Sequence, residues 1–283
     1  MVERALSRSL PEPFGPAKRL FESMRYSLLA GGKRLRPILA IASCEAVGGK
    51  GNAALGLACA LEMIHTYSLI HDDLPCMDDD DLRRGRPTNH KVYGDALAIL
   101  AGDALLTDAF KILARSAART VSPAIVLEVV AELAAAAGSG AMVAGQVIDI
   151  ESEGQDLDIT RLEHLHARKT GALFVAAIRG GARIGGACAL QLDRFTAFAR
   201  ALGLAFQVVD DILDCEATTE QMGKRTQKDK ARGKATYPSL IGLEDSRLLA
   251  RDLGRRAQDA LKAFDHRAEP LRALAGFVVE RNL

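Results

Sequence analysis

The sequence predicts an all-α fold, a single domain over residues 1–283 built as a bundle of about ten or more helices. Alanine and leucine dominate the chain, the alternation of β-branched residues typical of strands is scarce, and the nine prolines mostly fall between periodic segments. No linker or low-complexity stretch divides the chain, and 283 residues suit one large domain.

The apolar pattern places the helices in order. LACALEMIHTYSLI runs from Leu57 to Ile70 without a helix breaker, and the pattern resumes in ALAILAGDALLTDAFKIL. Pro37 suits the first turn of a helix, and AELAAAAG at 131–138 predicts a helix with a small-residue face for close packing. We expect helices near 16–30, 37–48, 52–73, 95–118, 123–137, 141–152, 160–170, 172–181, 190–213, 236–249, 250–264 and 268–281.

Composition narrows the class of protein. The chain is 48% apolar and 26% charged, which is ordinary for a soluble globular protein, and its net charge of +1 points neither to nucleic acid nor to an anionic membrane. The N-terminus lacks the apolar core of a signal peptide. No apolar run reaches the roughly 18 residues of a spanning helix, because Arg179 and Arg183 interrupt the best candidate, 172–190. Five scattered cysteines without a CxxC pair predict reduced thiols and a cytoplasmic location.

The most informative stretch is HDDLPCMDDDDLRRGR, from His71 to Arg86. It holds six aspartates within ten residues, followed by three arginines. Carboxylates this close resist ionising together unless a cation lies among them, and such oxygen ligands suit Mg²⁺ bound together with phosphate. The arginines add planar donor groups that match phosphate oxygens. The alternative is a solvated acidic loop, which the apolar helices expected on either side disfavour.

A second double aspartate ends an apolar run at FQVVDDILD, residues 206–214. Asp210 and Asp214 are four residues apart, so on a helix they share one face. Asp211 lies about 100° around the same helix. This spacing predicts a second group of oxygen ligands for metal.

The first motif has a different spacing. Pro75 and the longer step from Asp72 to Asp78 mean that an unbroken helix would not align the two carboxylates. We therefore expect the helix to loosen or end there and to return Asp78 toward the metal. Two acidic faces that end two apolar helices can hold metal ions between them, above a central apolar cavity.

Basic residues gather at three further places. GGKRLRP at 31–37 forms a glycine-started turn with three basic residues, and Lys169 with Thr170 stands between a charged helix and an apolar one. A lysine-rich loop follows between 223 and 234, with Lys224, Lys228, Lys230 and Lys234. Such a loop is either a solvated surface or, near an acidic metal site, a flap that closes over phosphate.

These motifs, taken together, resemble one family. Six segments are similar in content and order to those of the trans-isoprenyl diphosphate synthases: GGKRLRP, HDDLPCMDDDDLRRGRPTNH, LAGDALL, KTGALF, FQVVDDILD and GKATYPSL. The match covers nearly the whole chain. The DDxxxxD spacing from Asp72 to Asp78 is most similar to that of the bacterial farnesyl diphosphate synthases, or geranyltranstransferases.

The resemblance implies the isoprenoid synthase fold, a homodimer and a chain-elongating prenyltransferase. In that reaction an allylic diphosphate, dimethylallyl or geranyl, loses diphosphate with the help of two or three Mg²⁺ ions. The allylic cation is then attacked by the double bond of isopentenyl diphosphate. Diphosphate leaves once its charge is neutralised, and no protein nucleophile is needed because the bond that breaks is carbon–oxygen.

The resemblance also implies a role for each matching residue. Mg²⁺ would be bound by Asp72 and Asp78 at the first motif and by Asp210 and Asp214 at the second, supported by Asp211. The allylic diphosphate would be held by Arg83, Lys169, Lys224 and Lys234. The isopentenyl diphosphate would be held by Lys33, Arg36, His65 and Arg84. The reacting carbons would be lined by Thr170 and Gln207, with their oxygens facing the developing cation.

Taken alone, several of these residues have an ordinary structural interpretation. A lone histidine on an apolar helix, such as His65, is more often a satisfied core residue, and Gln207 alone would be a buried amide. Lys169 alone would be a charge that favours a helix C-terminus. The RTQ at 225–227 stands where relatives more often carry small residues, which leaves the details of the flap open.

We expect the positions of Tyr67 and Ser68, five and four residues before Asp72, to bear on product length, with the Tyr67 ring as the part that can reach the floor of the cavity. At about 1.5 Å per residue they lie about 6–7.5 Å below the metal, along the wall of the cavity. In similar bacterial enzymes an aromatic residue at the position of Tyr67 accompanies a farnesyl (C15) product, and smaller or unbranched residues accompany a geranylgeranyl (C20) product. We expect farnesyl diphosphate, with geranylgeranyl diphosphate as the alternative.

Three rival functions remain open. His65 and the His71–Asp72 pair suggest an HD-type metal-dependent phosphohydrolase, which leaves the Asp210 motif and both basic motifs unexplained. A catalytically silent partner subunit of a prenyl synthase is expected to have lost aspartates that this chain retains. A terpene cyclase shares the ionisation step but has no need of GGKRLRP for a second diphosphate.

Overall fold

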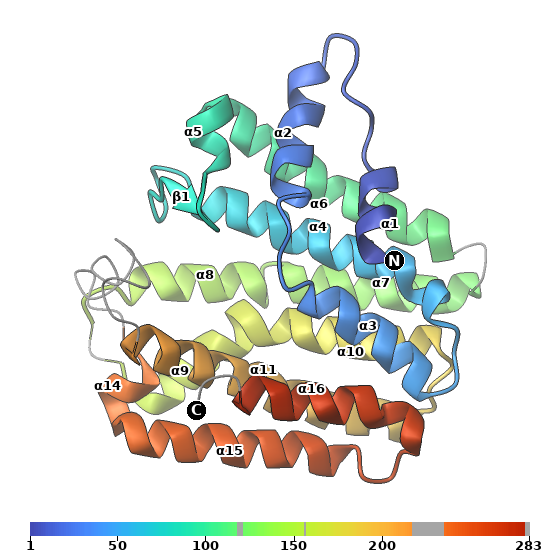
Figure 1. The fold of residues 1–283 in the computed structure, drawn as a ribbon, viewed down its shortest axis with the longest axis vertical. Helices are drawn as coiled ribbons and strands as arrows, with labels where there is room; N and C mark the ends of the chain where they lie inside the picture. Colours follow the sequence, from blue (N-terminus) through green and yellow to red (C-terminus); the bar gives the residue numbers. More distant parts are fainter. Residues whose placement is uncertain (118–120, 156, 217–234, 281–283) are drawn as a thin grey trace. The chain divides into compact units, whose positions relative to one another are not determined.

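The computed structural model describes residues 1–117, 121–155, 157–216 and 235–280, and it confirms the all-α prediction (Figure 1). Strands among these residues are limited to the antiparallel pair β1 (Leu82–Arg83) and β2 (Arg86–Pro87). Internal contacts divide the chain into two compact units. Unit 1 is Met1–Ile41 with Lys50–Val130, and unit 2 is Ala42–Gly49 with Ala131–Leu283. The single domain stays a prediction.

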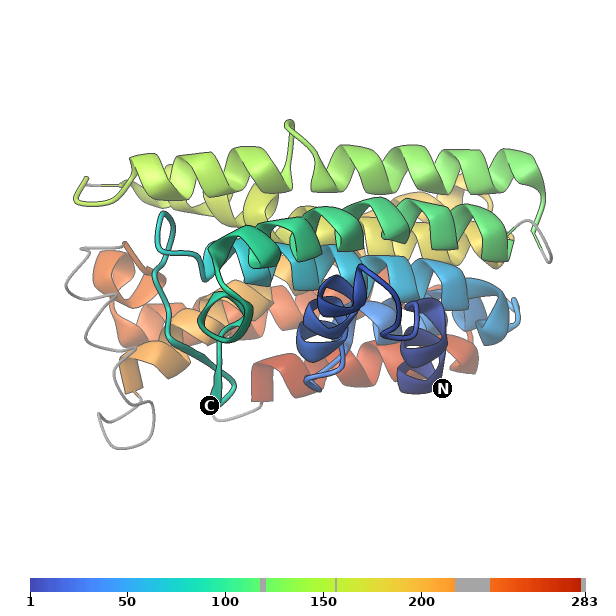
Figure 2. The same ribbon diagram turned by 90° about the horizontal axis from the view of Figure 1, so that it is seen from above.

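Unit 1 is organised around α4 (Leu55–Asp72) and α6 (Asp95–Ala117), which lie side by side in Figures 1 and 2. Most residues of α4 are buried on all sides, as expected of a helix with no polar face. Gly102 of α6 leaves room for the His71 ring, which a Cβ at this position would overlap. The other elements that begin in unit 1 are α1 (Val2–Ser9), α2 (Lys18–Leu28), α3 (Leu35–Ala46), the 3₁₀ turn η1 (Gly51–Ala54), α5 (Asn89–Tyr93) and α7 (Pro123–Ala137).

The sequence pattern missed two short helices of unit 1. α1 has the largely polar sequence VERALSRS, but it packs against α4 and its Leu6 is fully buried. α5 spans five residues and ends at Gly94, whose φ of +88° is in the left-handed region. Helices this short depend on tertiary contacts more than on their own periodicity, so the pattern gave no signal for them.

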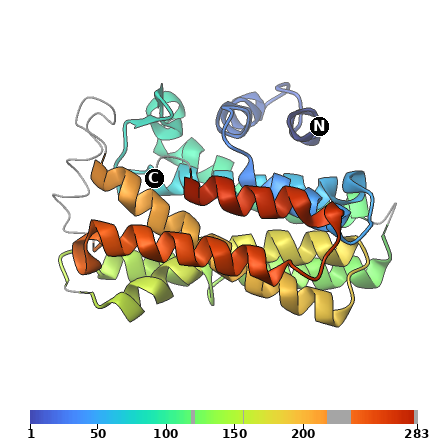
Figure 3. The ribbon, with the colours of Figure 1, turned by 60° about the horizontal axis from the view of Figure 1, so that its bottom comes forward.

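Unit 2 is organised around α11 (Ala189–Glu216), against which α10 (Ala172–Ile184) and α15 (Leu243–Ala260) pack. α15 and α16 (Glu269–Glu280) lie side by side in Figure 3. A buried cluster joins Val208 and Ile212 of α11 to Leu253 of α15. The other elements of unit 2 are α8 (Met142–Glu151), α9 (Ile159–His166), the π-helical turn η2 (Ala167–Gly171), α14 (Tyr237–Ile241) and the 3₁₀ turn η3 (His266–Ala268).

The predicted boundary between helices 236–249 and 250–264 is wrong. The break comes at Gly242, whose φ is +84°, and α15 then runs without interruption to Ala260. α14 is a separate short helix that begins with a capping box, in which Thr236 and Ser239 exchange hydrogen bonds. A single glycine inside a helical pattern was the signal for this break.

Charged residues inside the apolar helices of unit 2 are paired with each other. Arg179 and Arg183 of α10 bind the same Glu132 oxygen on α7, at 2.8 and 2.9 Å. Burial would raise the pKa of the Glu132 carboxyl, but the two guanidinium groups hold it below its ordinary value. The arginines that interrupt the apolar stretch 172–190 are therefore part of a structural ion-pair network.

Two helical stretches of the described residues are long and apolar enough to cross a membrane by length and composition, Gly51–Asp72 and Pro123–Glu151. In the first, 72% of the apolar window is buried within the structure, which is the pattern of a core helix. In the second the buried share is 28%. The absence of a membrane span stays a prediction.

His166 lies in the core of unit 2. Its ring stacks on Tyr237, with 5.7 Å between centroids, and its Nε2 is 4.0 Å from the carboxylate of Asp211. Burial lowers the pKa of His166 to about 4, with a smaller opposing effect from Asp149. The imidazole is therefore neutral at pH 7, and its contact with Asp211 is not an ion pair there.

Because this buried histidine is neutral, we predict that the folded protein loses stability as the pH falls. Between pH 7 and pH 5 the unfolded chain, with an ordinary histidine pKa of about 6.5, takes up a proton that the folded chain excludes. The free energy of unfolding should therefore fall by about 1–2 kcal/mol from this residue alone, with no further loss below about pH 4. Guanidinium unfolding of the wild type and of His166→Phe, which keeps the stacking, measures this difference.

The control is His266→Gln at an exposed histidine. It should keep the wild-type pH dependence. Equal pH dependence in the wild type and in His166→Phe would contradict the prediction.

Candidate active site

The first aspartate motif lies where α4 ends in unit 1. α4 stops at Asp72, and the chain folds back so that the Asp78 N–H donates to the Asp72 carbonyl oxygen at 2.8 Å. Asp79, with a φ of +50°, makes a left-handed step in this return. The helix ends before Pro75, as predicted, and the chain returns Asp78 to the end of α4. The binding of metal there stays a prediction.

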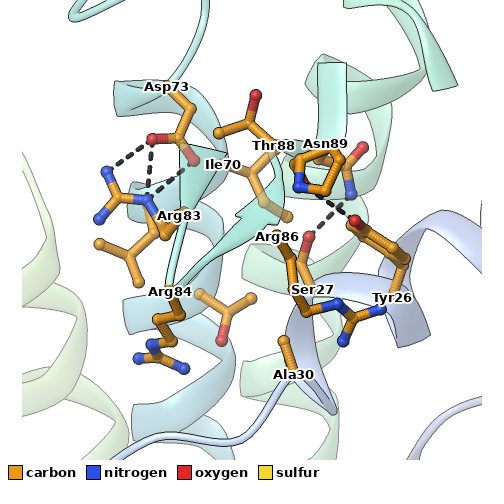
Figure 4. Close-up of a pocket in the computed structure, with 13 residues that line it drawn as sticks. Tyr26, Ser27, Ala30, Ile70, Asp73, Arg83, Arg84, Arg86, Thr88 and Asn89 are labelled. Atoms are coloured by element: carbon orange, nitrogen blue, oxygen red, sulfur yellow. Dashed lines mark hydrogen bonds and ion pairs between the residues drawn. The ribbon is translucent and has the colours of Figure 1, made fainter. Parts of the chain in front are cut away.

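The two aspartates at the end of α4 have different surroundings. Asp73 is 3% exposed, and its carboxylate binds Arg83 Nη2 at 2.6 Å and Nε at 2.8 Å (Figure 4). Burial would lower the pKa of the Arg83 guanidinium, but Asp73 raises it above its ordinary value. Asp72 and Asp78 are half-buried. The motif therefore uses Asp73 to orient an arginine and leaves the carboxylates of Asp72 and Asp78 nearer to solvent.

The glycine-rich turn at 31–37 lies against Arg84. The Arg84 guanidinium donates to the carbonyl oxygen of Gly31. It also lies so close to Gly32 that a Cβ there would be 2.6 Å from Nη1, and the φ of Gly32 is +136°. Backbone conformation and close approach both require glycine at this position. Lys33, the next residue, is exposed.

His65 lies among the basic residues of unit 1. Its pKa is well below the ordinary value, first because of burial and then because of the positive charges of Arg36, Arg84 and Arg83. A neutral imidazole can still donate one hydrogen bond to a phosphate oxygen. The structure therefore brings His65, Arg36 and Arg84 together in one positively charged region, and their role in binding stays a prediction.

A small pocket lies between α2, α4 and the β1–β2 hairpin. Figure 4 shows Arg83 and Arg84 on one side of it and Tyr26 on the other. The Arg86 Cζ atom lies over the Tyr26 ring, 4.6 Å from its centroid. The Tyr26 hydroxyl donates to the Pro87 carbonyl oxygen at 2.7 Å. The hairpin is thus held by α4 on one side and by α2 on the other, which fixes the directions of its arginines.

Unit 2 contains Lys169, predicted to hold the allylic diphosphate, and Thr170 and Gln207, predicted to line the reacting carbons. Thr170 of η2 donates from Oγ1 to Gln207 Oε1 of α11 at 2.8 Å. Lys169 Nζ binds Asp149 Oδ2 of α8 at 2.6 Å. All four residues are half-buried, so polar groups from three elements meet at a partly exposed place.

The backbone around Lys169 is unusual. The helix widens between α9 and α10 into a π-helical turn, Ala167–Gly171, a feature that often marks functional sites. Gly145 of α8 approaches this turn closely, because a Cβ there would be 2.6 Å from the Lys169 Cα. α8 and η2 therefore pack backbone to backbone, and this contact fixes where the Lys169 side chain begins.

The second aspartate motif lies near the C-terminal end of α11. Asp211 is buried, and its Oδ2 accepts the Tyr237 N–H at 3.0 Å. Asp210 is half-buried and Asp214 is exposed. As in the first motif, one aspartate of the pair is bound inside the protein, and the other carboxylates lie nearer to solvent.

The predicted chain-length residues lie on α4. Tyr67 is buried, and its ring meets the His71 ring edge-on, with 5.6 Å between centroids. Burial, and then the charge of Asp72, raise the pKa of the Tyr67 phenol. Ser68 Oγ donates to the His65 carbonyl oxygen at 2.9 Å. Lys224 and Lys234, with the rest of the predicted flap at 223–234, lie outside the described residues.

The sequence did not reveal Asp149, whose only signal is an acidic residue inside the apolar QVIDIE. Asp79 and Asp81 belong to the predicted acidic stretch, but the sequence did not group them with His90, and the three bring potential metal-ligand atoms within 4.8 Å of one another. Lys91 Nζ already binds Asp81 at 2.8 Å. We assign no ion to this group, because a cation of the protein itself is present.

Comparisons with known proteins agree with this geometry. Residues 17–266 match the family model of the polyprenyl synthetases. The chain is 52% identical to large subunit 1 of a heterodimeric geranylgeranyl pyrophosphate synthase of Arabidopsis thaliana, over 99% of this chain and 76% of the relative. It is 48% identical to a geranylgeranyl diphosphate synthase of Cyanophora paradoxa, over 100% and 93%. A crystal structure of an FPP/GFPP synthase from Zymomonas mobilis matches with a TM-score of 0.88 and 42% identity, over 98% and 94%.

The aspartate motifs, the basic groups beside them and these matches lead to one assignment. The isoprenoid synthase fold is confirmed. The chain belongs to the polyprenyl synthetase family, the trans-isoprenyl diphosphate synthases.

Proposed function

We propose that this prenyltransferase adds isopentenyl diphosphate to allylic diphosphates and carries the chain to geranylgeranyl diphosphate. The observation that carries the proposal is that unit 1 holds an acidic set at Asp72 and Asp78 together with a basic set at Arg36, His65 and Arg84. A hydrolase or a cyclase needs to hold one diphosphate, whereas condensation needs to hold two. The relatives named geranylgeranyl synthases, 48–52% identical, support the C20 product over the farnesyl product expected from the sequence.

The donor set fits Mg²⁺. The more exposed groups of both motifs, at Asp72, Asp78, Asp210 and Asp214, are carboxylates, whose oxygens are the ligands that Mg²⁺ prefers. The ions would be held by Asp72 and Asp78 at the first motif and by Asp210 and Asp214 at the second. Bound with diphosphate, Mg²⁺ acts as a Lewis acid that neutralises the leaving group.

The side chains of the protein bind and orient the substrates in this proposal. Arg83, oriented by Asp73, and Lys169, oriented by Asp149, hold the allylic diphosphate, joined by Lys224 and Lys234. The isopentenyl diphosphate is held by Lys33, Arg36, His65 and Arg84. The Thr170–Gln207 hydrogen bond turns oxygen atoms toward the developing cation, and an apolar cavity keeps water from it. The departing diphosphate takes the final proton.

Incubation of the protein with geranyl diphosphate, isopentenyl diphosphate and Mg²⁺, followed by product chromatography, tests the proposal. We expect chains longer by five-carbon steps, with release of diphosphate that depends on isopentenyl diphosphate. Asp72→Asn and Asp210→Asn should each lower kcat about a hundredfold or more, because a metal ligand to the leaving group is lost. Asp245→Asn, at an exposed aspartate of α15, is the matched control and should keep wild-type activity.

Two other outcomes would replace the proposal. Diphosphate release without isopentenyl diphosphate and without a longer chain indicates a phosphohydrolase. A cyclised product of unchanged carbon number indicates a terpene cyclase.

Farnesyl diphosphate is a second candidate product, and Tyr67 favours it. The ring is buried on α4, little more than one helical turn before Asp72. The related structure from Zymomonas mobilis is named an FPP/GFPP synthase, which is consistent with a product range that includes C15. The aromatic ring would then limit the depth available to the growing chain.

Tyr67→Ala tests whether this ring limits product length. Removal of the ring should lengthen the main product by at least about one C5 unit, because a buried aromatic-to-alanine change opens space. Product chain length is measured by chromatography at equal substrate concentrations. Tyr93→Ala on α5 is the matched control and should leave product length unchanged, as should Tyr67→Phe. An unchanged product in Tyr67→Ala would remove Tyr67 as the limit.

We also propose a homodimer, supported by an apolar stripe on α8 formed by Val143, Val147 and Ile150. These residues are spaced four and three apart, so they share one helix face, and each is close to half exposed. A contiguous apolar stripe of this kind is typical of a surface that another chain covers. The named relative from Arabidopsis thaliana is a subunit of a heterodimer, so a different partner chain is the alternative.

Val147→Glu should convert the dimer to monomer, because it places a charge in the middle of the stripe. Light scattering after size-exclusion chromatography measures the mass. Leu248→Glu, at an exposed leucine of α15, is the matched control and should remain dimeric. A monomeric wild type, or a dimeric Val147→Glu, would contradict the proposed homodimer.

We keep the cytoplasm as the proposed location. All five cysteines are free thiols, and burial raises the pKa of Cys44 to about 11 and of Cys59 to about 12. Unreactive buried thiols suit a reducing compartment. The relative from Arabidopsis thaliana is named chloroplastic.

A further inference from the structure

Arg34 differs from the other basic residues of the glycine-rich turn because it points inward. It is 8% exposed, whereas its neighbour Lys33 is exposed. Its guanidinium donates from Nε to Glu3 Oε1 at 2.6 Å, from Nη1 to Glu62 Oε1 at 2.5 Å and from Nη2 to the Leu28 carbonyl oxygen at 2.8 Å. The planar group of an arginine can reach three such partners at once, which a lysine ammonium on a single stem cannot do in this geometry.

The backbone of the turn depends on these contacts. Arg34 has a φ of +49°, a left-handed conformation that a long side chain rarely adopts. It follows Gly31 and Gly32, whose φ values of +80° and +136° are also positive. A strained residue of this kind persists only where its surroundings hold it. The positions of Lys33 and Arg36 on either side therefore depend on what holds Arg34.

The inner partner of Arg34 connects the turn to α4. Glu62 is 3% exposed and lies three residues before His65, so both share one face of the helix. Burial alone would lower the pKa of Arg34, but Glu3 and Glu62 raise it above its ordinary value. The guanidinium therefore stays charged and needs both carboxylates, because an unpaired buried charge is strongly unfavourable.

The outer partner comes from α1, which packs against α4 and precedes residue 17, where the family match begins. We propose that α1 is a latch on the isopentenyl diphosphate site: Glu3 closes the outer side of Arg34, and Glu3 and Arg34 act as positioning residues for Lys33 and Arg36. The identity of the substrate rests on the proposed function. The latch itself rests on the contacts among Glu3, Arg34 and Glu62.

Three full-length variants test the latch. Glu3→Gln keeps the shape of the side chain and removes its charge, and Arg34→Lys keeps the charge and removes the planar donor group. Glu12→Gln is the matched control, since this exposed glutamate near the N-terminus pairs with Arg25 at 3.5 Å instead. The measurements are KM for isopentenyl diphosphate, KM for geranyl diphosphate, and amide hydrogen exchange of residues 29–36.

We expect Glu3→Gln and Arg34→Lys to raise KM for isopentenyl diphosphate about three- to tenfold, with KM for geranyl diphosphate within about twofold of wild type. The double variant should have a KM for isopentenyl diphosphate no higher than that of Arg34→Lys alone, because both changes remove the same interaction between Glu3 and Arg34. Exchange at 29–36 should accelerate in both variants and not in Glu12→Gln.

The latch is overturned if KM for isopentenyl diphosphate stays within about twofold of wild type, or if both KM values rise together, which indicates general loosening. A wild type that makes no elongated product overturns the proposed function instead. In that case hydrogen exchange decides about the latch. Unchanged exchange at residues 29–36 in Glu3→Gln and Arg34→Lys refutes it. Faster exchange at these residues in both variants, but not in Glu12→Gln, supports it.

Discussion

Two adjacent carboxylates at the end of an apolar helix repel each other, and both aspartate motifs of this protein resolve that repulsion in the same way. Consecutive helical residues point about 100° apart, so one aspartate turns inward and the other does not. Asp73 turns to Arg83, and Asp211 turns to the Tyr237 N–H. The remaining carboxylates, at Asp72, Asp78, Asp210 and Asp214, are more exposed than Asp73 and Asp211. The rest of the site depends on this division.

The same logic extends to the cations. Arg83 is held by Asp73, Lys169 by Asp149, and Arg34 by Glu62 with Glu3. Each carboxylate restricts a long basic side chain. Under the proposed function, less side-chain entropy would therefore be lost when Arg83 and Lys169 bind diphosphate. Each carboxylate also balances charge locally, which explains how a chain with a net charge of +1 can hold several basic residues in one region. The same ion pairs thus order the basic side chains and balance their charge.

The sequence predicted the all-α fold and most long helices because their apolar periodicity is strong over many residues. It also predicted the return of Asp78 and the nearness of Thr170 to Gln207, the first from proline and spacing and the second from the family resemblance. It missed α1, α5 and the break at Gly242, where a few tertiary contacts or one backbone angle decide the structure. Asp149 and Glu62 escaped notice because a lone acid in an apolar run does not identify its partner. Sequence pattern does not predict product length, since product length depends on the space available to the growing chain.

The two faces of α8 have a consequence for anyone who alters this protein. Its backbone touches the π-helical turn at Gly145, its Asp149 binds Lys169, and its opposite face carries Val143, Val147 and Ile150. Both faces belong to one helix of ten residues, so a displacement of one face also moves the other. Crosslinkers, fusion tags or substitutions on the outer face of α8 would therefore also affect Lys169, which the other face of the same helix contacts. Mutational tolerance along α8 should therefore be lower than the exposure of its valines suggests.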